Sequence, residues 1–175
     1  MNKAIILDRD GTIIVDKIYL NDPDKIEYLP NAVAGLRKLR DEGYLFVVAT
    51  NQSGIPRGIV SLENLHEIHN RIDVYLKSEG INILSYYYAP YMTESNHPMR
   101  KPNTGMAELA ATEHNIDLKK SWFIGDKMSD VESGHRAGMR SIFLNGTEDP
   151  SKSDYKPAEL ECDDLLQAAN FILNN

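Results

Sequence analysis

Residues 4–12 have the sequence AIILDRDGT, an apolar run followed directly by two aspartates and a glycine. The run 4–7 is bounded by polar residues, which is the pattern of a short buried strand. Asp8 and Asp10 then lie at the carboxyl end of that strand, where ligands bind in open α/β sheets. Gly11 allows the backbone to turn sharply there. Two carboxylates in this arrangement can hold a hard cation, and one of them can also attack a substrate.

Outward from this segment, apolar strands and amphipathic helices alternate along the chain. We expect strands at about 3–8, 44–49, 83–88, 121–124 and 140–144, and helices at about 32–40, 61–78, 104–114, 130–137 and 164–173. Such alternation favours right-handed crossovers and a parallel sheet. If the second and fourth strands must both place residues beside Asp8, the first strand lies between them, which gives the order 3-2-1-4-5. The expected fold is an α/β, Rossmann-like three-layer sandwich forming a single domain over residues 1–175.

Composition limits the classes of protein that are compatible with the chain. With 175 residues, of which 42% are hydrophobic, the chain can bury a substantial core. The formal net charge of -7 argues against a surface that coats nucleic acid. The single cysteine, Cys162, excludes an internal disulfide and fits a reducing compartment. No signal sequence precedes the first strand, and no apolar run approaches the length of about 20 residues that a membrane span needs. We therefore expect a cytoplasmic monomer without nucleic-acid or membrane partners.

Polar residues of unusual kinds follow the other predicted strands as well. They are found at 50–51 after the second strand, at 100–101 in the loop after the third, and at 126–127 after the fourth. Each pair alone has an ordinary explanation, as a turn, as solvated surface charge or as a strand-to-helix connection. As an ordered set at one edge of a sheet, they indicate a catalytic site.

A calcium-binding loop is the main alternative interpretation of the two aspartates and the glycine. Such a loop requires flanking helices, a further oxygen ligand at its fifth position and a glutamate at its twelfth. Here a strand precedes the aspartates, the fifth position is Thr12 and the twelfth is Tyr19. The mismatch argues against calcium.

The four motifs, at 8–12, 50–51, 101 and 125–130, resemble those of the haloacid dehalogenase superfamily of phosphohydrolases. Longer matches at 50–58, 100–102, 105–106 and 125–127 resemble the D-glycero-D-manno-heptose 1,7-bisphosphate 7-phosphatases, and histidinol-phosphate phosphatases share nearly the same set. The resemblance implies a capless, Mg²⁺-dependent phosphomonoester hydrolase that removes the 7-phosphate of the heptose during synthesis of lipopolysaccharide precursors. Alternatives are histidinol phosphate, another small sugar phosphate or a nucleic-acid 3′-phosphate as substrate, and a phosphate-binding module without turnover.

The resemblance also implies a role for each matching residue. Asp8 would be the nucleophile that forms an aspartyl-phosphate, and Asp10 the general acid and then the base. Mg²⁺ would be held by the side chains of Asp8 and Asp126 and by the backbone carbonyl of Asp10. Thr50 and Asn51 would donate hydrogen bonds to the transferring phosphoryl group, and Lys101 would neutralise its charge. Substrate contacts are expected from Asp16, Tyr19, Asn51, Gln52, Ser53, Arg57, Arg100 and Lys127.

Two further expectations concern metals and helix ends. Asp130 would either orient the metal site or cap the helix that it begins. Relatives commonly bind a structural zinc in the loop at 89–99, but the matching positions here are Ala89, Tyr91, His97 and Met99. Only His97 could ligate, and zinc needs four such ligands, so we expect no zinc.

Two histidines on the second predicted helix could suggest another metal site. His66 and His69 are three residues apart, but no third ligand stands at a suitable spacing. We therefore expect both of them to be exposed helix residues.

Overall fold

A computed structural model describes all residues from 1 to 175. One parallel sheet, with the order β3-β2-β1-β4-β5-β6, forms the centre of the molecule. Its strands are β1 (Ala4–Leu7), β2 (Leu45–Asn51), β3 (Ile83–Ala89), β4 (Trp122–Gly125), β5 (Arg140–Leu144) and β6 (Leu160–Cys162). The predicted order of five strands is therefore confirmed. Strand β6 was not predicted, because it has only three residues and its middle residue is the exposed Glu161.

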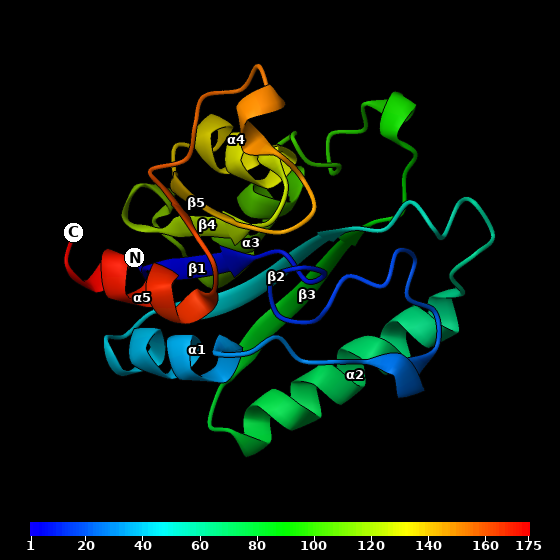
Figure 1. The fold of residues 1–175 in the computed structure, drawn as a ribbon, viewed down its shortest axis with the longest axis horizontal. Coiled ribbons are helices and arrows are strands. Elements are labelled where there is room, and N and C mark those ends of the chain that lie inside the picture. Colours follow the sequence, from blue (N-terminus) through cyan, green and yellow to red (C-terminus); the bar gives the residue numbers. More distant parts are fainter.

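Five α-helices cover the two faces of the sheet, which makes the fold a three-layer sandwich (Figure 1). They are α1 (Ala32–Asp41), α2 (Leu62–Ser78), α3 (Gly105–His114), α4 (Met128–Arg136) and α5 (Leu165–Leu173). Helices α1, α2 and α5 pack on one face, and α3 and α4 pack on the other. Single 3-10 turns occur at Pro23–Lys25, Thr93–Ser95, Leu118–Lys120 and Pro150–Lys152.

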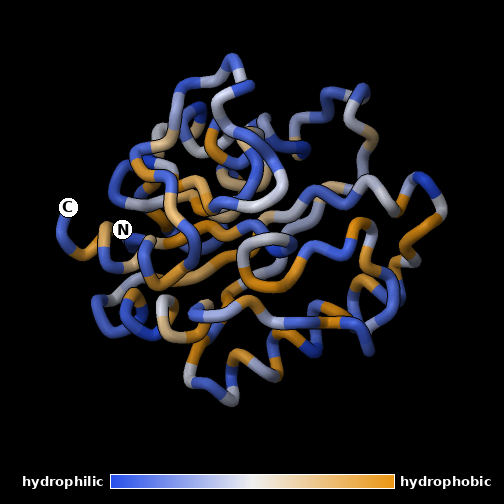
Figure 2. The backbone as a smooth tube through the Cα atoms, viewed as in Figure 1, coloured by the Kyte–Doolittle hydropathy of each residue, from blue (hydrophilic) through white to orange (hydrophobic).

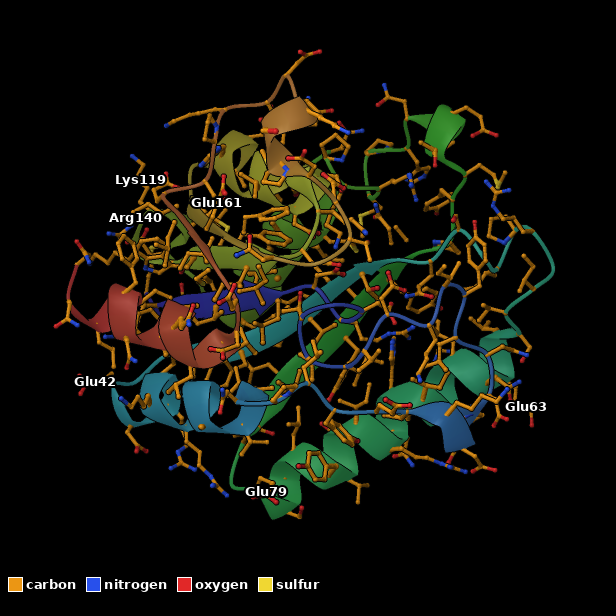
Figure 3. All side chains as sticks on the ribbon, viewed as in Figure 1. Glu42, Glu63, Glu79, Lys119, Arg140 and Glu161 are labelled. Carbon is orange, nitrogen blue, oxygen red and sulfur yellow. The ribbon has the colours of Figure 1, made fainter.

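The strands are apolar because helices bury them on both sides. All four residues of β1 are fully buried, and the tube in Figure 2 is most hydrophobic where it passes through the sheet. The largest core cluster has 24 residues and fills the layer beneath α1, α2 and α5. Charged side chains such as Glu42, Glu63 and Lys119 are exposed at the edge of the molecule (Figure 3). None of the helices combines the length and hydropathy that crossing a membrane requires.

The strand register aligns the residues that follow the strands at one edge of the sheet. Leu7 pairs with Val48 of β2 and with Ile124 of β4. Asp8 follows Leu7 directly, and its backbone N–H donates to the carbonyl of Ile124 at 3.0 Å. Thr50 and Asn51 are the last two residues of β2, while Asp126 comes immediately after β4. The topology therefore gathers the predicted motifs around Asp8.

Candidate active site

Three buried carboxylates meet where β1 and β4 end. Asp8 and Asp126 come from the two strand ends, and Asp130 comes from the first turn of α4. Oxygen atoms of all three lie within 4.8 Å of one another. Burial, together with the charge of the neighbouring Asp8, raises the pKa of both Asp126 and Asp130. Buried anions at such distances repel one another unless a cation compensates them.

The hydrogen bonds within this cluster indicate which carboxylate oxygens have no partner and could bind a cation. Both oxygens of Asp130 have partners: Oδ1 lies 2.6 Å from Nζ of Lys101, and Oδ2 accepts from the backbone N–H of Lys127 at 3.0 Å. Oδ1 of Asp126, in contrast, is buried without any partner. Carboxylate oxygens are the ligands that Mg²⁺ prefers. Asp8 and Asp126 thus fit the predicted metal site, and Asp130 supports it by holding Lys101.

Helix α4 begins two residues earlier than the sequence suggested, which changes the position of Asp130. The helix starts at Met128 with Lys127 as its N-cap, so Asp130 is the third residue of the helix and not its N-cap. The expected N-cap position was therefore wrong, but the side chain of Asp130 still caps the helix, because it belongs to a capping box with Lys127. Asp130 instead accepts the backbone N–H of Lys127 from inside the first turn and points its other oxygen at Lys101.

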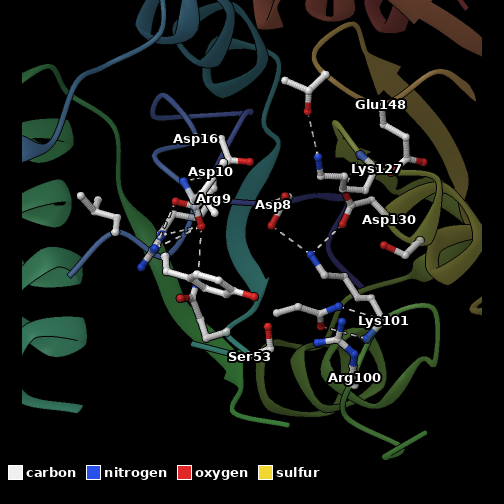
Figure 4. A pocket seen from close by; sticks show the side chains of 17 residues that line it. Asp8, Arg9, Asp10, Asp16, Ser53, Arg100, Lys101, Lys127, Asp130 and Glu148 are labelled. Atoms are coloured by element: carbon white, nitrogen blue, oxygen red, sulfur yellow. Dashed lines mark hydrogen bonds and ion pairs between the residues drawn. The ribbon is translucent and has the colours of Figure 1, made fainter. Parts of the chain in front are cut away.

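Lys101 supplies the positive charge that faces this cluster. Its side chain is 3% exposed, and Nζ contacts Oδ1 of Asp8 at 3.0 Å as well as Asp130 (Figure 4). The carbonyl of Ala49 also accepts from Nζ, at 2.6 Å. Although burial disfavours the charged form, Asp130 and Asp8 outweigh it and raise the pKa of Lys101. Lys101 is therefore a fixed cation beside the nucleophile candidate.

The side chain of Asn51 holds the backbone of Lys101. Its Nδ2 donates to the carbonyl of Lys101 at 3.1 Å, and its Oδ1 accepts from the N–H of Lys101 at 3.0 Å. The sequence predicts that Asn51 donates to a phosphoryl group, and the structure adds this positioning contact, which no spacing revealed. In the same way, Nε2 of Gln52 donates both to Thr50 Oγ1 at 2.7 Å and to Asp10 Oδ2 at 3.2 Å.

Asp10 lies on the other side of Asp8, in a fork formed by Arg9 (Figure 4). Arg9 Nε and Nη2 donate to the two carboxylate oxygens at 3.2 Å and 3.1 Å. Burial raises the pKa of Asp10, although Arg9 opposes the rise. A carboxyl group with a raised pKa is suited to donating a proton.

A cleft of about 490 Å³ opens above these groups. Many of the predicted site residues line it, namely Asp8, Asp10, Asp16, Tyr19, Asn51, Gln52, Ser53, Arg100, Lys101 and Lys127. Thr50 and Asp126 do not line it, and both are buried. Arg57 does not line it either, and its guanidinium lies 5.9 Å from the ring of Tyr19, which does. Thr147 and Glu148 were not predicted, and they line the cleft from the irregular segment after β5.

The segment from Ala89 to Met99 is held together by side-chain contacts. The rings of Tyr91 and His97, two of the four positions considered above for zinc, stack with centroids 3.5 Å apart at an angle of 8°. Arg100 donates to the carbonyl of Tyr91 at 3.1 Å and to Thr93 Oγ1 at 3.0 Å. An aromatic stack and the half-buried guanidinium of Arg100 therefore stabilise the wall of the cleft.

Gly11 and Asp126 illustrate how closely the backbone approaches the carboxylates. Gly11 has a φ of +78°, and a Cβ atom there would clash with the carboxylate of Asp126. Gly58 has a similar φ of +74°, but nothing lies within 4 Å of a Cβ built on it. An alanine at position 58 would cause backbone strain alone, whereas an alanine at position 11 would cause the same strain and a clash with Asp126.

We predict that Gly11→Ala weakens Mg²⁺ binding by about tenfold or more, since displacing a ligand or its support typically costs that much. Gly58→Ala, the matched control, suffers only backbone strain of about 1–2 kcal/mol and keeps its affinity for the metal. Isothermal titration calorimetry with MgCl₂ measures the affinity, and thermal melting measures the strain. Equal Mg²⁺ affinities in the two variants would contradict the assignment of Asp126 as a ligand.

A parallel sheet that gathers an aspartate pair, a buried lysine and a third carboxylate at its switch point defines a phosphatase of the haloacid dehalogenase superfamily. The chain belongs to the polynucleotide kinase 3 phosphatase family, whose family model matches residues 3–164. Its place in the superfamily was thus predicted correctly.

Several relatives match nearly the whole chain. A D-glycero-alpha-D-manno-heptose-1,7-bisphosphate 7-phosphatase from Photorhabdus laumondii is 36% identical over 165 residues, which cover 90% of each chain. A D-glycero-beta-D-manno-heptose-1,7-bisphosphate 7-phosphatase from Pasteurella multocida is also 36% identical, and the match covers 100% of this chain and 93% of the relative. Among solved structures, D,D-heptose 1,7-bisphosphate phosphatase from B. bronchiseptica, complexed with magnesium and phosphate, has a TM-score of 0.89 at 28% identity, and 98% of both chains is covered.

Proposed function

We propose that this phosphatase hydrolyses the 7-phosphate of D-glycero-D-manno-heptose 1,7-bisphosphate in a Mg²⁺-dependent reaction. The observation that carries the proposal is the contact of Asp8 with Lys101, together with the buried, unpartnered Oδ1 of Asp126, below a cleft that is lined by Asp8 and Asp10. The names of the relatives that match at least 90% of the chain supply the substrate class. The cleft volume of about 490 Å³ lies within the range for small-molecule sites.

Asp8 and Asp126 would hold Mg²⁺ with their side chains, and Asp10 would add its backbone carbonyl. The fit rests on the unpartnered Oδ1 of Asp126 and on the mutual repulsion of the buried carboxylates. When bound, the ion offsets the repulsion between the Asp8 carboxylate and the phosphate dianion.

In the first half-reaction, a carboxylate oxygen of Asp8 attacks the phosphorus. A bond between this oxygen and phosphorus forms while the ester P–O bond breaks, and the departing alkoxide takes the proton of Asp10. Lys101, and the donors Thr50 and Asn51, would stabilise the charge on the transferring phosphoryl group.

In the second half-reaction, water attacks the phosphorus of the aspartyl-phosphate. Asp10, now ionised, takes a proton from this water, and inorganic phosphate leaves while the Asp8 carboxylate is restored. Asp10 thus acts first as acid and then as base, which requires that its carboxyl group keeps one orientation through both steps.

Contacts with the rest of the substrate would come from the cleft wall. Arg100 and Lys127 are candidates for the second phosphate, since both line the cleft and carry positive charge in a chain that is acidic overall. Asp16, Tyr19, Gln52 and Ser53 would contact the sugar, and Arg57 would act next to Tyr19.

A substrate panel tests the proposal. We expect the purified protein with MgCl₂ to release phosphate from heptose 1,7-bisphosphate with a kcat/KM at least about tenfold above that for histidinol phosphate or a 3′-phosphorylated oligonucleotide, because distinct polar contacts discriminate by at least this factor. Both anomers of the heptose are assayed, and addition of EDTA is expected to abolish release. A higher kcat/KM for histidinol phosphate would replace the proposed substrate, and no release from any ester would refute the proposed activity.

A further inference from the structure

Arg9 is among the largest fully buried side chains of the protein, although it directly follows Asp8. Its side chain is 1% exposed. Two of its nitrogens, Nε and Nη2, donate hydrogen bonds to the carboxylate of Asp10. The remaining one, Nη1, lies 3.1 Å from Nε2 of His69 in the middle of α2. Arg9, which binds the carboxylate of Asp10, is therefore itself bound by His69 of α2, 60 residues further along the chain.

His69 is buried, with 6% of its surface exposed, so the expectation of an exposed histidine was wrong for this residue, whereas His66 is exposed. Arginine carries only hydrogen-bond donors, so Nε2 of His69 must accept, which requires the neutral ring. Burial and the charge of Arg9 lower the pKa of His69 to about 3, in agreement with a neutral ring. The ring also stacks on Tyr86 of β3, with centroids 5.1 Å apart at 24°. Its orientation is thus fixed from two sides.

We propose that His69 is a positioning residue for the phosphatase reaction, acting through Arg9 on Asp10. The fork of Arg9 sets the plane of the Asp10 carboxyl and hence the direction in which its proton leaves. Nη1 needs an acceptor, because an unpaired donor on a buried arginine is costly. Without His69, Arg9 would turn toward another acceptor and the carboxyl would lose its orientation. This inference rests on the proposed function, in which Asp10 protonates the leaving group.

A histidine that merely packs in the core would affect all substrates alike, whereas a positioning residue for the acid would not. An alkyl phosphate such as the heptose ester needs its leaving oxygen protonated, while p-nitrophenyl phosphate releases a stable phenolate that needs little help. The parameter kcat/KM covers the steps up to release of the leaving group. The change that a variant causes in the ratio of kcat/KM for the alkyl phosphate to kcat/KM for p-nitrophenyl phosphate therefore reports the contribution of Asp10 as the acid.

The experiment compares four variants with the wild-type protein. His69→Phe keeps the ring against Tyr86 but removes the acceptor, and His69→Leu removes it with a smaller side chain. His69→Gln retains an acceptor oxygen, and His66→Leu is the matched control on the exposed side of the same helix. Thermal melting establishes that each variant is folded. ¹⁵N NMR of the Arg9 Nε–H, assigned with Arg9→Lys, follows the guanidinium without any need for activity.

We expect His69→Phe and His69→Leu to lower kcat/KM for the alkyl phosphate by about tenfold or more, because misplacing a reacting group has effects of this size. For p-nitrophenyl phosphate, we expect the same variants to lower kcat/KM by less than about threefold. His69→Gln should restore most of the loss, and His66→Leu should match the wild type. The Arg9 Nε–H signal should shift or exchange faster in the Phe and Leu variants only. An equal loss on both substrates, or an unchanged Arg9 signal, overturns the inference. A wild-type protein inactive on both esters refutes the proposed function instead, and the NMR comparison still decides whether His69 orients Arg9.

Discussion

Asp8→Asn is expected to lower phosphate release by at least about a thousandfold, because an amide cannot attack phosphorus and losses of this order follow removal of a nucleophile. The change is nearly isosteric, and the amide oxygen can still accept from Nζ of Lys101, which lies 3.0 Å from Oδ1 of Asp8. We therefore expect the thermal melting midpoint to stay within a few degrees of the wild-type value. Steady-state release of phosphate from the heptose bisphosphate measures the loss.

Acid quenching during turnover provides the second measurement. The wild-type protein is expected to carry a covalent phosphoryl group on Asp8, which mass spectrometry of the digested protein locates, and the variant is expected to carry none. Asp41→Asn is the matched control, since Asp41 is exposed at the end of α1. Normal turnover by Asp8→Asn, or a phosphoryl group on another residue, would show that the nucleophile has been misassigned.

The sequence predicts the part of the site that depends on where strands end. Asp8 and Asp126 follow short apolar runs, and such runs between helices indicate buried parallel strands whose ends meet. Thr50 and Asn51 belong to the same category, although the structure includes them in β2 rather than after it. The resemblance to known motifs then assigned the chemistry, so the fold and the principal carboxylates followed from local patterns.

The contacts that orient these residues have no local pattern. Arg9 and His69 are separated by 60 positions, and the pair joins two elements that only the tertiary fold brings together. One indication was available, because His69 lies four residues after Leu65 and three before Ile72, which places it on the buried face of α2. The hydrogen bonds between the Asn51 side chain and the Lys101 backbone have no such pattern in the sequence, because they depend on how the loop after β3 returns to the sheet.

Removal of the buried cation should have the second large effect. Lys101→Met is expected to destabilise the fold by about 3–5 kcal/mol, because it leaves the carboxylates of Asp8 and Asp130 buried without compensation. Phosphate release should fall by about a hundredfold or more, since a preorganised donor to the developing charge is lost as well. Urea unfolding and steady-state kinetics measure the two effects, and Lys120→Met, whose side chain is 73% exposed, is the matched control.

The double variant Lys101→Met/Asp130→Asn separates the two roles of the lysine. Asp130 has Lys101 as its only cationic side-chain partner at salt-bridge distance, so neutralising it removes one of the two uncompensated charges. We expect much of the lost stability to return while activity stays low, because a neutral pair repairs the buried charge but places no cation at the phosphoryl group. Recovery of activity along with stability would mean that Lys101 only balances charge in the folded protein. Loss of activity without loss of stability would mean that solvent compensates the carboxylates, which their burial in this structure argues against.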